Sequence, residues 1–151
     1  MSYRPNIDAV LWFTDQVFER IRERVPEAKF FIVGNRPHSR LNALRDRAGV
    51  QITGWVPDVN PFLHAATVYV APLRMGSGTR LKLLQAMAAR RAIVSTTTGA
   101  QGLDVQDRVH VRLADTAEAF ATAVIELLEN PAERVALGER AASHVARRYD
   151  W

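Results

Sequence analysis

The chain has 151 residues, of which 48% are hydrophobic and 24% charged, the composition of one globular domain large enough to bury a core. No apolar run approaches the ~18 residues of a membrane span, and no apolar signal region opens the sequence, so we predict a cytoplasmic location, the inner face of the membrane included. The absence of cysteine excludes disulfides and thiolate metal sites, and four scattered histidines predict no metal site.

The hydrophobic pattern predicts helices alternating with short strands. Apolar residues at helical spacing predict a helix over 7–24. A continuous apolar run over 29–33, closed by Gly34, predicts a strand that is covered on both faces. Similar patterns predict later helices over 39–48, 60–65, 79–89, 117–130 and 137–149, and strands over 50–53, 67–71, 92–96 and 109–113.

Strands that alternate with helices in this way predict right-handed βαβ units and a parallel sheet with helices on both faces. We therefore expect a single α/β domain over residues 1–151, a doubly wound, Rossmann-like parallel sheet.

Charge is distributed unevenly along the chain, which has a net charge of +4. Residues 59–103 contain no Asp or Glu, although the chain has 16 acidic residues elsewhere. A cationic section without carboxylates suits an anionic ligand, although buried strands and a core helix that simply lack charge would look the same. The basic residues are not interleaved with aromatic ones, so we predict no nucleic-acid partner despite a pI near 10.1. The cations of this section are Arg74, Arg80, Lys82, Arg90 and Arg91.

A glycine-rich turn follows the predicted strand over 67–71. Glycines let a backbone approach a ligand closely, and the helix that follows presents unpaired N–H groups and the positive end of its dipole. Together these features predict an anion site, while an ordinary glycine-rich turn with solvated basic side chains is the alternative. The residues predicted to face the anion are Gly76, Ser77, Gly78, Thr79, Arg80 and Lys82.

Helical spacing sorts the side chains after this turn. Lys82 and Gln85 are predicted to project together toward the ligand, because they lie on the face that Gly78 and Ala89 share. A cation followed by an amide suits a diphosphate followed by a ribose. The opposite face, predicted to pack on the core, holds Leu83, Leu84, Met87 and Ala88.

The run Pro-Leu-Arg-Met-Gly-Ser-Gly-Thr-Arg-Leu-Lys-Leu-Leu-Gln-Ala-Met-Ala over 72–88 resembles bacterial group 1 glycosyltransferases of family 4. Other segments agree in sequence and order, namely 3–8, 31–34, 52–58, 93–96, 99–103 and 149–151. Members of that family are retaining enzymes of GT-B architecture. The resemblance implies that this chain is the C-terminal, donor-binding half of such an enzyme, which transfers a hexosyl group from a nucleotide-diphosphate sugar to a glycan or glycoconjugate.

The resemblance also assigns roles to residues, although it leaves the catalytic residues unknown. It implies that the glycine-rich turn faces the diphosphate or the sugar, that Arg80 and Lys82 offset phosphate charge, and that Gln85 contacts the ribose. It places Val56 and Pro57 beside the base and Gly34 at the border of the same cleft. It implies no cofactor and no metal, since protein cations and helix dipoles stabilise the leaving nucleoside diphosphate.

Four positions depart from the family pattern. Gln85 and Gln101 stand where the family commonly has Glu, and Ser77 stands where an earlier acidic residue is found. Arg90 replaces a glycine after the helix, where a left-handed backbone favours glycine. These departures favour an alternative function, a degenerate and non-catalytic nucleotide-binding or assembly module.

The resemblance further implies that two parts of the family architecture are missing from these residues, namely the strand that precedes residue 1 and the N-terminal acceptor domain. We therefore expect a fragment that is inactive alone, with an exposed sheet edge that could support self-association.

Overall fold

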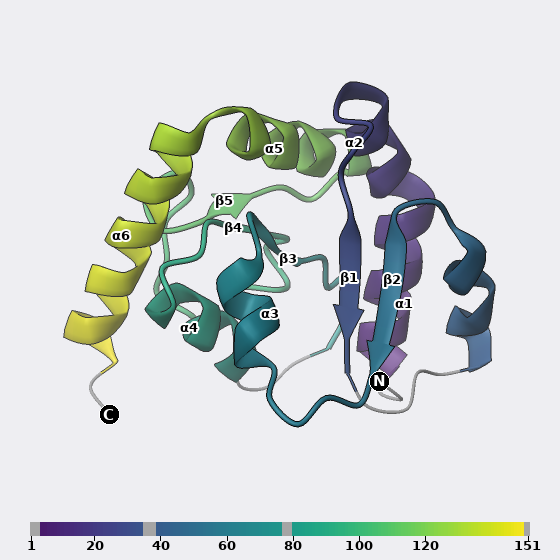
Figure 1. Ribbon diagram of the computed structural model, residues 1–151. Coiled ribbons are helices and arrows are strands. Elements are labelled where there is room, and N and C mark those ends of the chain that lie inside the picture. The colour runs from purple at the N-terminus through teal and green to yellow at the C-terminus, as the bar shows by residue number, and fades with distance from the viewer. Residues whose placement is uncertain (1–3, 35–38, 77–79, 150–151) are drawn as a thin grey trace.

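The computed structural model describes residues 4–34, 39–76 and 80–149. Helices and parallel strands alternate along the chain, as the sequence pattern predicts (Figure 1). In chain order the elements are α1 (Arg4–Trp12), η1 (Phe13–Val17), α2 (Phe18–Arg24), β1 (Phe30–Val33), η2 (Ser39–Asp46), β2 (Val50–Gly54), α3 (Asn60–Ala65), β3 (Tyr69–Ala71), α4 (Leu81–Ala88), β4 (Ile93–Ser95), β5 (Arg112–Leu113), α5 (Ala117–Glu129) and α6 (Pro131–Arg148).

The first helix is continuous from α1 to α2 but widens into one π-helical turn at η1. The wider turn leaves the Thr14 carbonyl to accept a hydrogen bond of 2.9 Å from Arg47. Arg47 also forms ion pairs of 2.9 Å with Asp15 and 3.0 Å with Glu19. The π-helical turn therefore attaches the helix to the segment that follows η2.

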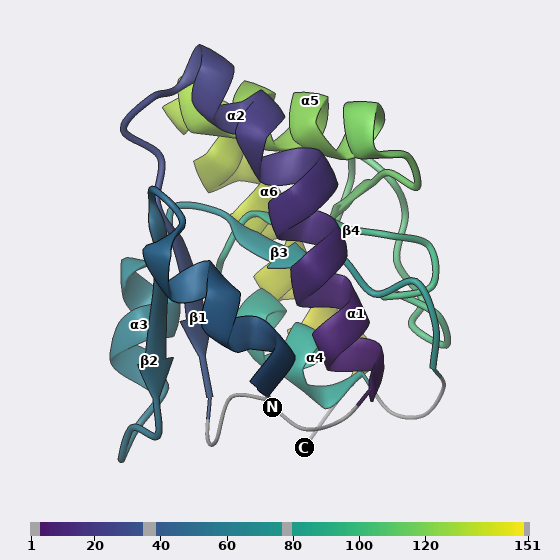
Figure 2. The ribbon, with the colours of Figure 1, turned by 90° about the vertical axis from the view of Figure 1, so that its right-hand side faces the viewer.

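All strand pairing is parallel, but the strands form two sheets instead of the single sheet expected. β1 pairs with β2 in one sheet, and the other has the order β3-β4-β5. In both views the strands of one sheet run steeply across those of the other (Figures 1 and 2). The fold is thus an α/β arrangement of parallel strands whose sheet is divided between β1 and β3.

Helices cover both faces of the first sheet, with α1 and η2 on one side and α3 on the other (Figure 2). The larger of two hydrophobic clusters joins the first helix to both sheets and to α5, and its aromatic centre includes Phe13, Phe30 and Phe120. The second cluster packs α4 against β4, β5 and α6. The amphipathic patterns in the sequence therefore correspond to real buried faces.

Several predicted boundaries differ from those observed. The first helix begins at Arg4, residues 39–46 form a 3-10 helix, and the predicted strand over 109–113 contains only Arg112 and Leu113. The last helix begins at Pro131, because the Asn130 side chain caps it by accepting a bond from the Glu133 amide. The predicted helix over 79–89 becomes α4, and Arg80 precedes it in a non-helical conformation.

Arg90 has the left-handed backbone that its position after α4 predicts, with φ at 62°. The turn runs directly against α6, since a Cβ placed on Gly138 would lie 2.3 Å from the Arg90 carbonyl oxygen. The arginine side chain is exposed and reaches Glu139 only at 3.8 Å. Arg90 therefore strains the backbone with little compensation from its side chain.

Replacing Arg90 by Gly is expected to raise the free energy of unfolding by about 0.5–1 kcal/mol, because Gly adopts this conformation without a steric penalty. Urea unfolding followed by circular dichroism measures the change. Arg90→Ala is the matched control, because it removes the same charged side chain but keeps Cβ. If the two variants are equally stable, the strain assigned to Arg90 is absent.

A polar cluster connects α6 to the segment between β4 and β5. The rings of His110 and His144 stack with centroids 3.8 Å apart, and His144 also contacts the Asp104 carbonyl. The Tyr149 hydroxyl accepts a bond of 2.9 Å from the Asp104 amide. Burial lowers the pKa of His110 below its usual 6.5, and repulsion from His144 and nearby arginines adds to this, while Asp104 opposes it.

The lowered pKa of His110 predicts a loss of stability in acid. As pH falls through 6.5 toward the folded pKa, the unfolded chain binds a proton that the folded chain resists, so the free energy of unfolding decreases. Urea unfolding at pH 7.5 and at pH 5.5 measures the free energy of unfolding on either side of the ordinary histidine pKa of 6.5. His110→Gln should reduce this pH dependence, and an unchanged dependence in the variant would assign it to other groups.

Candidate functional site

The carboxyl ends of β3 and β4 lie side by side, because the two strands pair in register from Tyr69 opposite Ile93 to Ala71 opposite Ser95. The segment 72–80 leaves the first of these ends and leads into α4, while the segment 96–102 leaves the second. In parallel α/β sheets ligands bind at this edge. Residues 72–76, which lead toward the glycine-rich turn, therefore leave the edge at which parallel α/β sheets bind ligands.

The Arg74 side chain attaches the segment after β3 to α1. It forms two hydrogen bonds with the Asp8 carboxylate, at 2.7 and 3.1 Å, and its guanidinium lies 5.4 Å from the centre of the Trp12 ring. The pKa of Arg74 is raised above its ordinary value, chiefly by the hydrogen bonds to Asp8. Arg74 is therefore occupied with a carboxylate in this state, although its section of sequence lacks acidic residues.

Backbone carbonyls near the turn are held by side chains of neighbouring segments. The Thr96 hydroxyl donates to the Leu73 carbonyl and accepts a bond of 2.9 Å from the Gly99 amide. Arg80 donates to the Gly76 carbonyl at 3.3 Å and to the Thr98 carbonyl at 2.9 Å. These contacts fix the two segments relative to each other before any ligand binds.

Two glycines at this edge stand at positions that disfavour a side chain. Gly76 has a φ of 104°, which side-chain-bearing residues rarely adopt. A Cβ on Gly99 would lie 2.8 Å from the Ala71 carbonyl and 2.6 Å from the Ser95 hydroxyl. A side chain on Gly99 would push the two segments apart, and a side chain on Gly76 would strain its backbone.

The first turn of α4 presents backbone N–H groups at the edge of the strands. The Leu84 amide bonds to the Arg80 carbonyl at 3.1 Å, whereas the amides of Leu81, Lys82 and Leu83 have no backbone acceptor within the described residues. Lys82 is exposed beside them. Backbone donors, the helix dipole and one ammonium group thus lie together at the start of this helix.

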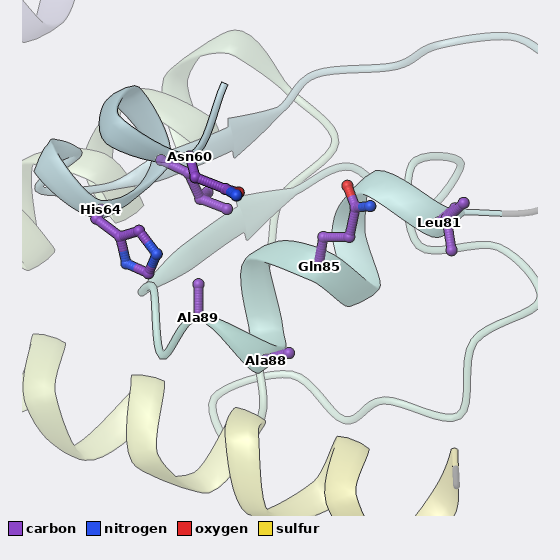
Figure 3. A pocket seen from close by; sticks show the side chains of 7 residues that line it. Asn60, His64, Leu81, Gln85, Ala88 and Ala89 are labelled. Carbon is purple, nitrogen blue, oxygen red and sulfur yellow. The ribbon is translucent and has the colours of Figure 1, made fainter. Parts of the chain in front are cut away.

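An open pocket of about 560 Å³ separates α3 from α4 (Figure 3). Asn60 and His64 approach it from α3, and Gln85 approaches it from α4 (Figure 3). Its volume is in the range of small-molecule sites, and its polar groups are amides and an imidazole. The residues that line it are Asn60, Leu63, His64, Leu81, Gln85, Ala88 and Ala89.

Gln85 is the predicted site residue that the pocket includes. Lys82 projects from the adjacent face of α4 instead, so the two side chains are exposed, as predicted, but do not line one pocket. Ala88 faces the pocket and Ala86 packs on the core, which reverses the prediction for Ala88. Successive side chains of an α-helix are rotated by about 100° around its axis. The buried face of α4 is centred slightly to one side of the face that the spacing predicts.

The other predicted residues that the structure describes lie outside the pocket lining. Gly34 follows β1, and half-buried Val56 and exposed Pro57 follow β2. The Arg80 guanidinium donates hydrogen bonds to the Gly76 and Thr98 carbonyls. Ser77, Gly78 and Thr79 lie outside the described residues.

Sequence reasoning missed Asn60 and His64 as site residues. They lie four residues apart on α3, a spacing that predicts that their side chains share one face of the helix. In the described ranges, no cluster of three or more His, Asp or Glu side chains could hold a metal ion. No helix in the same ranges is both long and apolar enough to cross a bilayer.

Comparison with known families identifies the chain. Residues 1–130 match the family described as "Glycosyl transferases group 1". The chain belongs to this family. The match confirms the resemblance inferred from the glycine-rich run and from the order of the other motifs.

Curated relatives include two mannosyltransferases. The chain is 36% identical over 104 residues to the lipopolysaccharide core biosynthesis mannosyltransferase LpcC of Rhizobium leguminosarum bv. viciae, an alignment that covers 68% of this chain and 29% of LpcC. It is 32% identical over 137 residues to the phosphatidyl-myo-inositol mannosyltransferase of Mycolicibacterium smegmatis, covering 85% of this chain and 34% of the relative. The chain thus spans about a third of the length of these relatives.

Solved glycosyltransferase structures share the fold. S. aureus TarM, in a crystal structure that contains UDP, superposes with a TM-score of 0.80 at 18% identity, covering 99% of this chain and 31% of TarM. This similarity confirms the Rossmann-like fold of a GT-B glycosyltransferase.

Proposed function

We propose that this domain binds the nucleoside diphosphate part of a nucleotide sugar, as the donor half of a retaining glycosyltransferase. The group transferred would be a hexose, and the names of the curated relatives make mannose the first sugar to test. The acceptor would be a glycan or glycoconjugate, held by residues beyond these 151. In that arrangement the isolated chain binds the donor but transfers nothing.

The observation that carries the proposal is the position of Gln85 behind the first turn of α4. The amides of Leu81–Leu83, which have no backbone acceptor within the described residues, and the Lys82 ammonium group can receive a diphosphate at the start of this helix. One turn further along, Gln85 enters the pocket between α3 and α4. A ribose attached to the diphosphate would reach that pocket, where the amide of Gln85 could bond to its hydroxyl groups.

The same donors supply the chemistry that transfer requires. Breaking the bond from sugar to phosphate leaves negative charge on the departing diphosphate, and prearranged N–H groups, a helix dipole and a cation stabilise that charge. Lys82 provides the charge in the present geometry. Arg80 acts on the backbone, holding the Gly76 and Thr98 carbonyls, and so positions the turn. We propose that no metal or cofactor takes part.

Two features favour the second candidate, a module that keeps the fold but not the catalytic function. Gln85 binds a ribose less strongly than a carboxylate would. Arg90 strains the turn directly after α4. Both residues lie on or next to the helix that forms the proposed site, and nucleotide titration of the folded chain separates the two candidates.

Gln85→Glu is expected to tighten the binding of UDP or GDP about five- to tenfold, because hydrogen bonds to a charged acceptor are about twice as strong. Isothermal titration calorimetry measures the Kd of both nucleotides. Gln16→Glu, at an exposed position of η1, adds the same charge away from the site and should leave Kd unchanged. Equal or weaker binding by Gln85→Glu would remove Gln85 from the ribose contact.

Lys82→Gln is expected to weaken nucleotide binding about tenfold at low salt and by less at high salt, since screening reduces the attraction that is lost. The chain offers a close control, because Lys29 is its only other lysine and lies ahead of β1 at the opposite edge of the strands. Lys29→Gln should bind as the unmodified chain does. Titrations that cannot distinguish the two variants would contradict the role of Lys82.

A further inference from the structure

The carboxylate that holds Arg74 comes from outside its own stretch of sequence. Residues 59–103 contain no Asp or Glu, so Arg74 has no acidic neighbour close to it in the chain. Asp8 of α1 supplies the carboxylate, and two nitrogens of the guanidinium bond to its two oxygens at 2.7 and 3.1 Å. Paired bonds of this kind fix the direction of a side chain as well as its distance. The pair therefore gives the segment after β3 a defined orientation relative to α1.

Asp8 and Trp12 together form the surface of α1 that receives the guanidinium. They lie four residues apart, the spacing at which helical side chains are neighbours. The Asp8 side chain is only 20% exposed, and the centre of the Trp12 ring lies 5.4 Å from the guanidinium of Arg74. The Trp12 ring packs in turn, edge to face, against the buried ring of Phe120, with centroids 5.7 Å apart. This surface is therefore anchored in the hydrophobic core.

The segment after β3 is attached to three parts of the molecule. Thr96 bonds to the Leu73 carbonyl, and Arg80 donates to the Gly76 carbonyl at 3.3 Å. Both of these partners belong to the segments that form the candidate site, so they can move together with it. Arg74 lies between the two points, and its partner is on a separate helix. Of these three attachments, the one through Arg74 is thus the one that ties the candidate site to α1.

A direct contact between Arg74 and the phosphates is the alternative role for this residue. It would require the guanidinium to leave the Asp8 carboxylate, which is largely covered and would lose both hydrogen bonds. Leaving a covered charged group without its partner is unfavourable. The two roles also predict opposite results when the charge of Asp8 is removed, because a released Arg74 could then bind a phosphate.

We propose that Asp8 is a positioning residue for the nucleotide. Through Arg74 it holds the segment after β3, and with it the start of α4, in the orientation that receives a diphosphate. The inference rests on the proposed function, since it takes the start of α4 as the diphosphate site. Without the pair, the amides of Leu81–Leu83 and the Lys82 ammonium group lose their common orientation, so affinity falls although every group that binds is still present.

Isothermal titration calorimetry with UDP and with GDP tests the proposal in Asp8→Asn, in Arg74→Gln and in the double variant. We expect each single variant to weaken nucleotide binding about five- to tenfold, and the double variant to bind as weakly as the singles, because either change already breaks the same pair. Asp8→Glu keeps a carboxylate and should bind more tightly than Asp8→Asn. Global stability should change little, because partly exposed ion pairs contribute little to it.

Asp15→Asn is the matched control for Asp8→Asn. It removes a carboxylate of the same first helix from an arginine, Arg47, with which Asp15 forms a pair of 2.9 Å. This control should leave Kd unchanged. An unchanged Kd in folded Asp8→Asn, additive losses in the double variant, or equal weakening by Asp8→Asn and Asp8→Glu would each overturn the proposal. Tighter binding by Asp8→Asn would also overturn it and assign Arg74 to the phosphates.

Hydrogen exchange without nucleotide separates this proposal from the proposed function. The Leu84 amide bonds to the Arg80 carbonyl at the start of α4 and should exchange about three- to tenfold faster in Asp8→Asn. The Arg134 amide makes the equivalent bond to the Asn130 carbonyl at the start of α6 and should not change. If the unmodified chain binds neither nucleotide, the proposed function fails and the exchange of Leu84 decides alone. Faster exchange then supports the role of Asp8, and unchanged exchange overturns it.

Discussion

The parallel pairing of β3 with β4 is the constraint on which the candidate site depends. It brings the ends of two segments together, and side-chain bonds then hold one segment to the other. Thr96 bonds to the Leu73 carbonyl, Arg80 bonds to the Thr98 carbonyl, and Gly99 lies too close to the Ala71 carbonyl for any side chain. These contacts fix the place where α4 begins, and with it the direction of the amides that would meet a diphosphate.

The separation of the strands into two sheets and the unusual residues near α4, Arg90 and Gln85, affect the molecule on different scales. The core between the first helix and α5 crosses both sheets, so the domain has one hydrophobic interior although β1 and β3 do not pair. Arg90 acts on a smaller scale, through backbone strain. Gln85 would act through the strength of its proposed hydrogen bond to a ribose, so the proposed site would keep its backbone while its affinity is reduced.

Sequence reasoning predicted the features that depend on local chemistry. Apolar spacing located α5 and α6, the glycine-rich run located the turn after β3, and the position of Arg90 predicted its left-handed backbone. It did not predict features that depend on distant partners. The bond between Arg74 and Asp8 joins residues 66 apart, and Asn60 and His64 line a pocket only because α3 lies beside α4. Periodicity alone also could not distinguish Ala86 from Ala88, since the core decides which of two alanines is buried.

The central claim is that the start of α4 and the pocket behind it together receive a nucleoside diphosphate. Two-dimensional NMR of the labelled chain, titrated with UDP and with GDP, tests it directly. The account predicts that at least one nucleotide shifts the backbone amides of Leu81, Lys82 and Leu83 and the side-chain amide of Gln85 together. Shifts confined to other surfaces, or none in the folded chain at millimolar nucleotide, would contradict it.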